Sequence, residues 1–156
     1  MQWHSCSFSE LDSGTLYQIL QLRVDVFVVE QNCPYPELDG KDLLPGTLHL
    51  YLQNEQKVLA YARILPPGAS YADNPSLGRI CVAQSARQLA LGKELVRRSI
   101  ELAEQQWPAN PIRISAQCYL QRFYEDLGFR AASEPYLEDD IPHLQMIKYF
   151  QQTATA

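Results

Sequence analysis

The sequence lacks the surplus of basic residues with which nucleic-acid-binding proteins displace phosphate counterions. Its 156 residues include 13 Lys and Arg against 18 Asp and Glu, giving a net charge of −5, so we predict no nucleic-acid partner. No apolar run approaches the ~18 residues of a membrane-spanning helix, so we predict no membrane partner. Repeats and interdomain linkers are also absent. We expect one domain over residues 1–150, followed by a flexible tail at 151–156.

Cysteine is scarce, and its spacing matches no metal-binding pattern. The four cysteines lie far apart, at Cys6, Cys33, Cys81 and Cys118. The acids around Asp39 lack the alternation of a calcium loop, so we predict no metal. Residues 1–6 have neither the basic start nor the apolar stretch of a secretory signal. Together these features predict free thiols and a cytoplasmic location.

Hydrophobic periodicity predicts the element order β-α-β-β-β-α-β-α-β-β. The strongest helical pattern begins at Leu91 and ends before Pro108, while the first helix is expected to run to Glu30. Strand, helix and strand in the middle of the chain imply a right-handed crossover between parallel neighbours. The other strands are connected as hairpins. We therefore predict an α+β (mixed α/β) fold, with strands at 3–8, 47–52, 58–65, 78–83, 112–116, near 129 and at 144–150, and helices at 16–30, 91–107 and 119–127.

The turn between the predicted strand at 78–83 and the helix at Leu91 is a candidate phosphate-binding site. A helix N-terminus presents unpaired N–H groups and a positive dipole end to an anion. The basic residues Arg87, Lys93, Arg97 and Arg98 outnumber the single acid Glu94 here, although the whole chain is acidic. From the spacing alone, an ordinary solvated helix face is the equal alternative.

The same turn resembles the acetyl-CoA loop of GNAT N-acetyltransferases. Their pattern, Arg/Gln-x-x-Gly-x-Gly/Ala, here reads Arg87-Gln88-Leu89-Ala90-Leu91-Gly92, with Ala90 and Gln88 at positions where glycine is common. The segment Gln117–Phe129 is similar to the GNAT ending Asn-x-x-Ala-x-x-Phe-Tyr-Glu-x-x-Gly-Phe, with matches at Phe123, Tyr124, Glu125, Gly128 and Phe129. Three further segments, at 23–35, 37–42 and 136–143, resemble the ElaA branch of these proteins.

This resemblance implies a fold, a co-substrate and a reaction. The expected GNAT fold has a central, mostly antiparallel sheet of about six or seven strands with a splayed parallel pair, flanked by about four helices. The expected reaction transfers an acetyl group from acetyl-CoA to a primary amine, which is a small cationic molecule or a protein lysine or N-terminus. A backbone N–H near Val82 would donate to the thioester oxygen. The expected coenzyme contacts are Ile80, Cys81, Val82, Arg87, Gln88, Leu89, Ala90, Leu91, Gly92, Lys93, Gln117 and Tyr124.

For catalysis, the resemblance implies that Tyr124 is the general acid, with its hydroxyl directed at the coenzyme sulfur. Taken alone, the residue also fits a packed core aromatic. The general base is left open among Glu30, Glu37, Asp39, His49, Glu138, Asp139, Asp140 and His143. We prefer Glu37, Asp39 and His143, because loops flanking the cleft would carry them; for each acid, capping a turn is the alternative. The acidic loop at 31–46 predicts a cationic acceptor.

Three other interpretations remain open at this stage. The chain could be a non-catalytic coenzyme-A-binding or sensing domain, which would need the phosphate-binding turn but no proton donor. Cys33 could be a reactive thiol partnered by His49 or His143, although buried cysteines usually serve packing. Trp3, Tyr149 and Phe150 either form an apolar patch that pairs two chains as a homodimer or complete the core.

Overall fold

The computed structural model describes residues 1–150, and the predicted tail at 151–156 lies outside the described residues. The strands are β1 (Gln2–Cys6), β2 (Leu48–Asn54), β3 (Lys57–Leu65), β4 (Ser76–Val82), β5 (Ile112–Gln117), β6 (Arg130–Ala131), β7 (Tyr136–Glu138) and β8 (Ile141–Lys148). The helices are α1 (Ser13–Val24), the π-helix η2 (Asp25–Glu30), α2 (Leu91–Gln106) and α3 (Gln121–Asp126), with short 3₁₀ turns η1 (Phe8–Glu10), η3 (Lys41–Leu43), η4 (Gln84–Leu89) and η5 (Cys118–Leu120).

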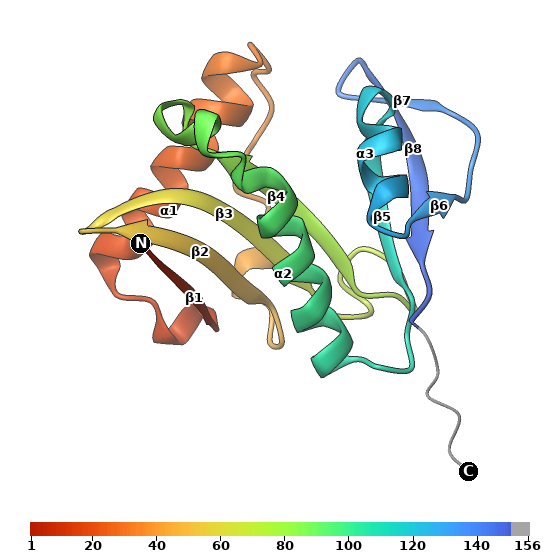
Figure 1. Ribbon diagram of the computed structural model, residues 1–156, viewed down its shortest axis with the longest axis horizontal. Coiled ribbons are helices and arrows are strands. Elements are labelled where there is room, and N and C mark those ends of the chain that lie inside the picture. The colour runs from red at the N-terminus through yellow and green to blue at the C-terminus, as the bar shows by residue number, and fades with distance from the viewer. Residues whose placement is uncertain (151–156) are drawn as a thin grey trace.

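The strands form two antiparallel sheets that meet along β4 and β5 (Figure 1). The first sheet has the order β1-β2-β3-β4, and in the second β8 pairs with β5, β6 and β7. Among residues 1–150, no ladder joins β4 to β5. Hydrogen bonds hold the two strands together only at their beginnings, where Arg113 N donates to the Pro75 carbonyl at 3.0 Å and Asn74 Nδ2 donates to the Pro111 carbonyl at 2.9 Å. The predicted splayed pair of strands is therefore confirmed.

The first helix has two parts with different winding. Asp12 caps α1, since its Oδ1 accepts a hydrogen bond from Thr15 N at 2.7 Å. From Asp25 to Glu30 the chain widens into a π-helix, a rare form that is frequent at functional sites. The sequence places the β-branched run of Val24, Val26, Val28 and Val29 there, and such residues fit an α-helix less well. The predicted helix up to Glu30 is confirmed, with this change of winding.

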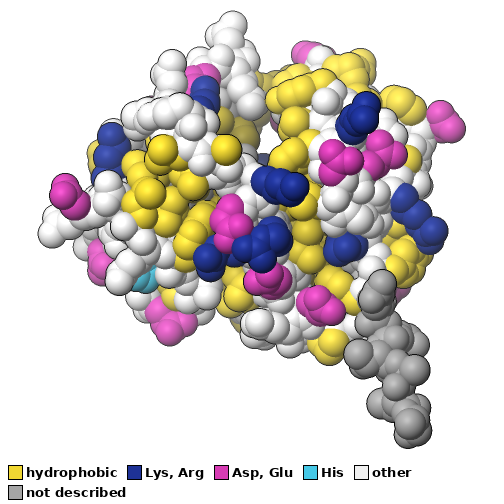
Figure 2. Space-filling view, in the orientation of Figure 1, with side chains coloured by type: hydrophobic (Ala, Val, Ile, Leu, Met, Phe, Trp, Pro, Cys, Tyr) yellow, Lys and Arg dark blue, Asp and Glu magenta, His cyan; other side chains and the backbone are white. Residues whose placement is uncertain are grey.

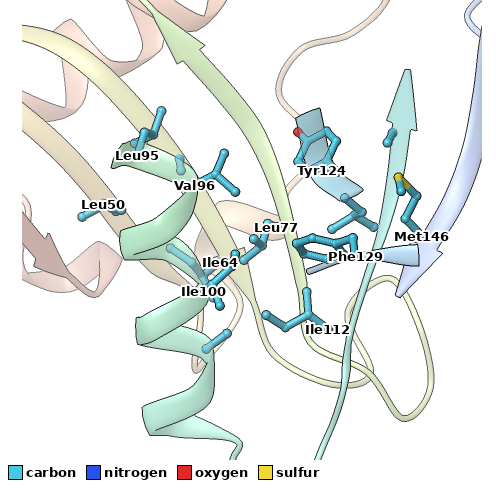
Figure 3. Close-up of a cluster of buried hydrophobic side chains, with 14 of the residues drawn as sticks. Leu50, Ile64, Leu77, Leu95, Val96, Ile100, Ile112, Tyr124, Phe129 and Met146 are labelled. Carbon is cyan, nitrogen blue, oxygen red and sulfur yellow. The ribbon is translucent and has the colours of Figure 1, made fainter. Parts of the chain in front are cut away.

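Two apolar clusters cover opposite faces of the first sheet. One lies under α1, and the larger one lies under α2 and continues into the second sheet. In Figure 3, Leu95, Val96 and Ile100 of α2 face this larger cluster, which reaches Phe129 and Met146. Side-chain packing in the larger cluster thus joins the two sheets, although no ladder joins β4 to β5 among the described residues.

The residues of the predicted dimer patch do not form one patch. Trp3 and Phe150 are partly buried against the larger apolar cluster, and Tyr149 alone is exposed. The arrangement of Trp3 and Phe150 therefore agrees with the alternative that they complete the core, and a homodimer stays an untested prediction. Among the described residues, no helix has the combination of length and apolar character that crossing a bilayer demands.

Candidate active site

A cavity of about 790 Å³ opens where β4 and β5 diverge. Its lining comes from η2, the loop that follows it, β4, β5, α3 and the β7–β8 hairpin. Figure 2 shows the same feature as a hollow between the part of the surface formed by the first sheet and the part formed by the second. The cavity is therefore a consequence of the missing ladder between the two central strands.

A β-bulge turns β4 away from β5. The register between β3 and β4 shifts between Tyr61 and Arg63, which places one extra residue in β4. Arg79 in this bulge has φ +48°, a left-handed conformation that costs a non-glycine residue about 1–2 kcal/mol. Its side chain stabilises the conformation, because Arg79 Nε donates to Glu37 Oε2 at 2.8 Å. Beyond the bulge, β4 has no strand partner on its β5 side among the described residues.

The predicted phosphate-binding turn ends at a helix N-terminus without a side-chain cap. Ala90 precedes α2 and has φ +53°, a conformation that glycine adopts at no steric cost. A Cβ atom added at Gly92 would meet no atom within 4 Å. Arg87 lines the cavity, whereas the other coenzyme contacts predicted in this turn, from Gln88 to Lys93, are not among its lining residues. The first-turn N–H groups of α2 thus have no side-chain cap and are available to an anion, although α2 itself does not line the cavity.

The positive charge around this turn is smaller than the sequence suggests. Arg87 Nη2 lies 2.6 Å from Glu30 Oε2, and both Arg97 and Arg98 pair with Glu94 at 2.7 Å. Figure 2 shows basic and acidic side chains mixed over α2. Lys93 is exposed and has no ion pair among the described residues, so it is the side chain left to meet an anion here.

Tyr124 has a ring that packs in the core and also lines the cavity. Its ring packs edge-on against Phe123 and Phe129, with centroid distances of 5.2 and 5.7 Å. Figure 3 shows its oxygen directed away from Phe129, toward the side of the cleft formed by β4. The residue lines the cavity and is 8% exposed. Burial, with a smaller effect of Tyr119, raises the pKa of the Tyr124 hydroxyl to about 12.

The side chains of the other predicted coenzyme contacts, which lie on β4 and β5, point in different directions. Ile80, Val82 and Gln117 line the cavity. The Cys81 side chain is buried in the smaller apolar cluster under α1, and that burial raises the pKa of its thiol. Cys81 therefore offers the cavity its backbone rather than its sulfur.

Two of the predicted bases lie in a network of six charged residues, which we call the arginine network: Arg23, Arg63, Arg79, Glu37, Asp39 and Asp42. Glu37 Oε2 accepts from Arg23 Nε and Arg79 Nε, both at 2.8 Å. Asp39 receives two hydrogen bonds from Arg63, at 2.9 and 2.8 Å. Burial opposes the charge on Asp39, but the Arg63 hydrogen bonds, the hydrogen bond from Lys41 N and the charges of Arg63 and Arg79 together outweigh it and lower the pKa to about 2. A carboxylate of such low pKa is a weak proton acceptor at neutral pH.

His49 is buried beside Asp42 of the arginine network. It is 1% exposed and does not line the cavity. Its Nδ1 lies 2.7 Å from the Tyr61 hydroxyl and its Nε2 lies 3.2 Å from the Asp42 carbonyl. Burial lowers the pKa of His49. The surroundings fit a structural role in the core.

The opposite wall of the cavity carries a second polar group, which we call the β7–β8 cluster: Ser115, Tyr136, Glu138 and His143. His143 is 6% exposed, and its Nδ1 lies 2.7 Å from the Ile141 carbonyl. Its Nε2 lies 3.4 Å from Glu138 Oε2. The Ser115 hydroxyl donates to Glu138 Oε1 at 3.2 Å and also contacts the Tyr136 hydroxyl. Ser115 in β5 and Tyr136 in β7 were not among the predicted site residues, although Tyr136 begins the segment 136–143 that resembles the ElaA branch.

Cys33 lines the cavity but lacks the surroundings of a nucleophile. Burial raises the pKa of its thiol, and the nearby Asp139 and Asp140 raise it further. A thiol held protonated in this way is a poor nucleophile. No hydrogen bond joins it to His49 or His143, and no group of three metal-binding side chains is found within residues 1–150.

Comparisons with known proteins agree with this geometry. A family model described as an acetyltransferase (GNAT) domain matches residues 37–150. The protein ElaA of Escherichia coli is 38% identical over 148 residues, which cover 95% of this chain and 96% of ElaA. The solved structure of an acyl-CoA N-acyltransferase from Pseudomonas aeruginosa has a TM-score of 0.90 at 42% identity, covering 94% of this chain and 98% of that one. The solved structure of E. coli ElaA has a TM-score of 0.88 over the same shares.

Proposed function

The chain belongs to the GNAT acetyltransferase family, in its ElaA branch, and from this premise we propose that it transfers an acetyl group from acetyl-CoA to a primary amine. The observation that carries the proposal is the cavity between β4 and β5, whose lining includes Arg87 of the turn that leads into the uncapped N-terminus of α2. That arrangement provides N–H donors for a pyrophosphate and an unpaired strand edge for an amide-containing chain.

The residues of this chain fit coenzyme A in three places. The N–H groups of Leu91, Gly92 and Lys93 are the proposed pyrophosphate donors. The backbone of β4 from Ile80 to Val82 is the proposed partner of the pantetheine amides, because it has no strand on that side. A backbone N–H near Val82 is the proposed donor to the thioester oxygen, a contribution typically worth ~3 kcal/mol. Gln88, Leu89 and Ala90 shape the turn, and Gln117 lies on the opposite wall.

We propose Tyr124 as the general acid and His143 as the general base. If the Nδ1–H of His143 donates to the Ile141 carbonyl, its Nε2 lone pair is left for the acceptor. The acceptor's ammonium gives one proton to Nε2, and the amine nitrogen then attacks the thioester carbonyl carbon. Nitrogen loses a second proton to water as the C–S bond breaks, His143 returns its proton to solvent, and the leaving thiolate takes a proton from Tyr124, which solvent replaces. One proton is released overall.

The surroundings of the other predicted bases support a different role. Glu37 and Asp39 accept hydrogen bonds from arginines, so we assign them to holding the bulge of β4 rather than to proton transfer. The pKa of about 12 at Tyr124 supports its role as acid, since the phenol stays protonated at neutral pH. Proton transfer from this phenol to a thiolate with a pKa near 8–9 runs against the difference in pKa, and holding the two groups together removes only the cost of bringing them into contact.

The first test is a thermal melt of the wild type and Gly92→Glu, with and without acetyl-CoA. At about a hundred times Kd the ligand adds ~2.7 kcal/mol, which is roughly 5–10 °C for a chain of this size. We expect this shift in the wild type and its loss in Gly92→Glu, because the new carboxylate would lie at the proposed pyrophosphate site. Gly92→Gln, of the same size without the charge, is the matched control and should keep most of the shift.

Two results would separate this proposal from its alternatives. An absent shift in the folded wild type, or an equal shift in Gly92→Glu, would contradict binding at α2. A normal shift in a protein that releases no coenzyme A with any amine would favour the non-catalytic sensing domain. The acetyl group itself, rather than a longer acyl chain, is tested by comparing turnover of acetyl-CoA with that of longer thioesters.

A further inference from the structure

The carboxylates that line the cavity differ in whether an arginine neutralises them. Glu30 pairs with Arg87, Glu37 with Arg23 and Arg79, and Asp39 with Arg63. Glu138 and Asp139 also line the cavity, and neither has an Arg or Lys partner among the described residues. The negative charge available to a ligand therefore lies on the β7–β8 hairpin and not in the acidic loop at 31–46.

We infer that Glu138 binds the ammonium group of the acceptor beside His143, so that this site selects cationic primary amines over neutral ones. The inference rests on the proposed acyl transfer and names its acceptor class and its selecting residue. Glu138 is chosen over Asp139 because its carboxylate accepts a hydrogen bond from the Ser115 hydroxyl. Asp139 occupies the turn at φ +52° and makes no side-chain hydrogen bond among the described residues.

The β7–β8 cluster leaves one oxygen of Glu138 free. The single proton of the Ser115 hydroxyl goes to Glu138 Oε1, so in the contact between Ser115 and Tyr136 the proton must come from Tyr136. Within residues 1–150, Glu138 Oε2 receives no hydrogen bond, and it lies 3.4 Å from His143 Nε2. Ser115 and Tyr136 act as positioning residues that hold one side of the carboxylate and turn the other toward His143.

Glu138 Oε2 and His143 Nε2 both need a hydrogen-bond donor from a ligand or from solvent. If Nδ1–H of His143 donates to the Ile141 carbonyl, Nε2 is an acceptor, and two acceptors then face one another. An ammonium group has three N–H donors and one positive charge. Such a group satisfies both atoms and brings the proton to be removed next to the base. A neutral amine satisfies them less well, because it lacks the charge.

The experiment compares benzylamine, a cation at neutral pH, with aniline, which is neutral there and of similar shape. For Glu138→Gln we expect kcat/KM for benzylamine to fall about tenfold, mainly through KM, as for loss of one hydrogen bond to a charged group. The value for aniline should stay within about twofold, because aniline brings no charge to the site. Glu134→Gln, which removes an exposed acid that does not line the cavity, is the matched control and should change neither substrate.

Each other outcome overturns the inference in a recognisable way. Equal losses for both amines in Glu138→Gln would mean a structural role, and no loss would mean that the ammonium lies elsewhere. A selective loss in Asp139→Asn instead would place the ammonium on the turn. If the wild type acetylates neither amine although acetyl-CoA still raises its melting temperature, the proposed amine acetylation fails and the inference falls with it.

The positioning residues have their own test. We expect Tyr136→Phe and Ser115→Ala to raise KM for benzylamine about threefold with kcat unchanged. Ser115→Ala removes the hydrogen bond to Glu138, and Tyr136→Phe removes the hydrogen bond that orients the Ser115 hydroxyl. Ser115→Thr keeps the hydroxyl and should restore the wild-type KM. A fall in kcat with KM unchanged, or failure of the Thr variant to restore KM, would contradict positioning through Glu138.

Discussion

The two walls of the cavity have similar ionisable side chains in opposite surroundings. On the wall of β4 and the loop at 31–46, Arg23 and Arg63 are 1% and 3% exposed, and each acid of the arginine network contacts at least one guanidinium. On the wall of β5, β7 and β8, the Glu138 side chain is half-exposed and forms no ion pair with an Arg or Lys of residues 1–150; the ring of His143 lies beside it. The comparison teaches that counting acids in a segment does not measure the charge that a ligand meets, since partners from elsewhere in the chain can neutralise them.

The largest expected effect comes from breaking the first wall. Arg23→Ala removes one of the two guanidinium partners of both Glu37 and Asp42, and loss of one member of a buried ion pair costs about 3–5 kcal/mol. Glu138→Gln on the second wall should change the free energy of unfolding by less than about 0.5 kcal/mol. Urea denaturation of both variants measures the difference. Similar losses in the two variants would show that the walls are not distinct in this way.

The next effect concerns catalysis on the second side of the cavity. Tyr124→Phe keeps the ring packed against Phe123 and Phe129 and removes only the hydroxyl. We expect kcat to fall roughly 100-fold, as for loss of a general acid, with the melting-temperature shift by acetyl-CoA unchanged. Steady-state kinetics and thermal melts measure the two quantities. Unchanged turnover would remove Tyr124 from the mechanism.

A smaller effect is expected where β4 leads into α2. Ala90 has φ +53°, a conformation that costs alanine about 1–2 kcal/mol. Glycine would not pay this cost, but its greater freedom in the unfolded chain would lower the free energy of unfolding by about 0.4–1 kcal/mol. We therefore expect Ala90→Gly to raise the free energy of unfolding by about 0.5–1 kcal/mol. Chemical denaturation tests it, with Ala131→Gly on exposed β6 as the control that should lose stability. Destabilisation by Ala90→Gly would mean that the Ala90 methyl group makes contacts that outweigh the strain.

The smallest effect is a dependence of stability on pH. The pKa of Asp39 is lowered from 3.8 to about 2 in the folded chain, so between these values the unfolded chain binds more protons. The stability that Asp39 contributes is thus fully present above about pH 4 and is lost as the pH falls toward about 2. Asp39→Asn should reduce the loss of stability over this interval, whereas Asp73→Asn, at an exposed acid, should not. Identical acid profiles for wild type and Asp39→Asn would contradict the pairing with Arg63.

Local pattern predicted most of the fold. The period of 3.6 residues in α2 and the strand alternation of β2 are visible in the sequence, because each depends on neighbours along the chain. β7 and the short turn η4 have too few residues for a period to appear. The bulge at Arg79 could not be predicted either, since its φ depends on a hydrogen bond to Glu37, 42 positions away.

The candidate site divides in the same way. Tyr124 and the turn before Gly92 were found because they lie in contiguous motifs. Glu37 and Asp39 were chosen as bases because they stand in a polar loop, but their arginine partners lie 14 and 24 positions away. One signal was present: Arg63 lies within the otherwise apolar strand β3, and a buried arginine needs a carboxylate partner. That signal predicts an ion pair without saying which acid completes it.

Two acids of the arginine network each bind two arginines, and this limits which substitutions the family can accept at these positions. Glu37 Oε2 accepts from two arginines, and Asp42 Oδ1 accepts from Arg23 and Arg63 at 2.7 and 3.1 Å. Loss of either acid therefore leaves two guanidinium groups short of a partner, and for Glu37 one of them is Arg79 at the bulge of β4. No single substitution compensates for this, so these six positions should be inherited together or replaced together, whereas Glu138 can change alone and with it the choice of acceptor.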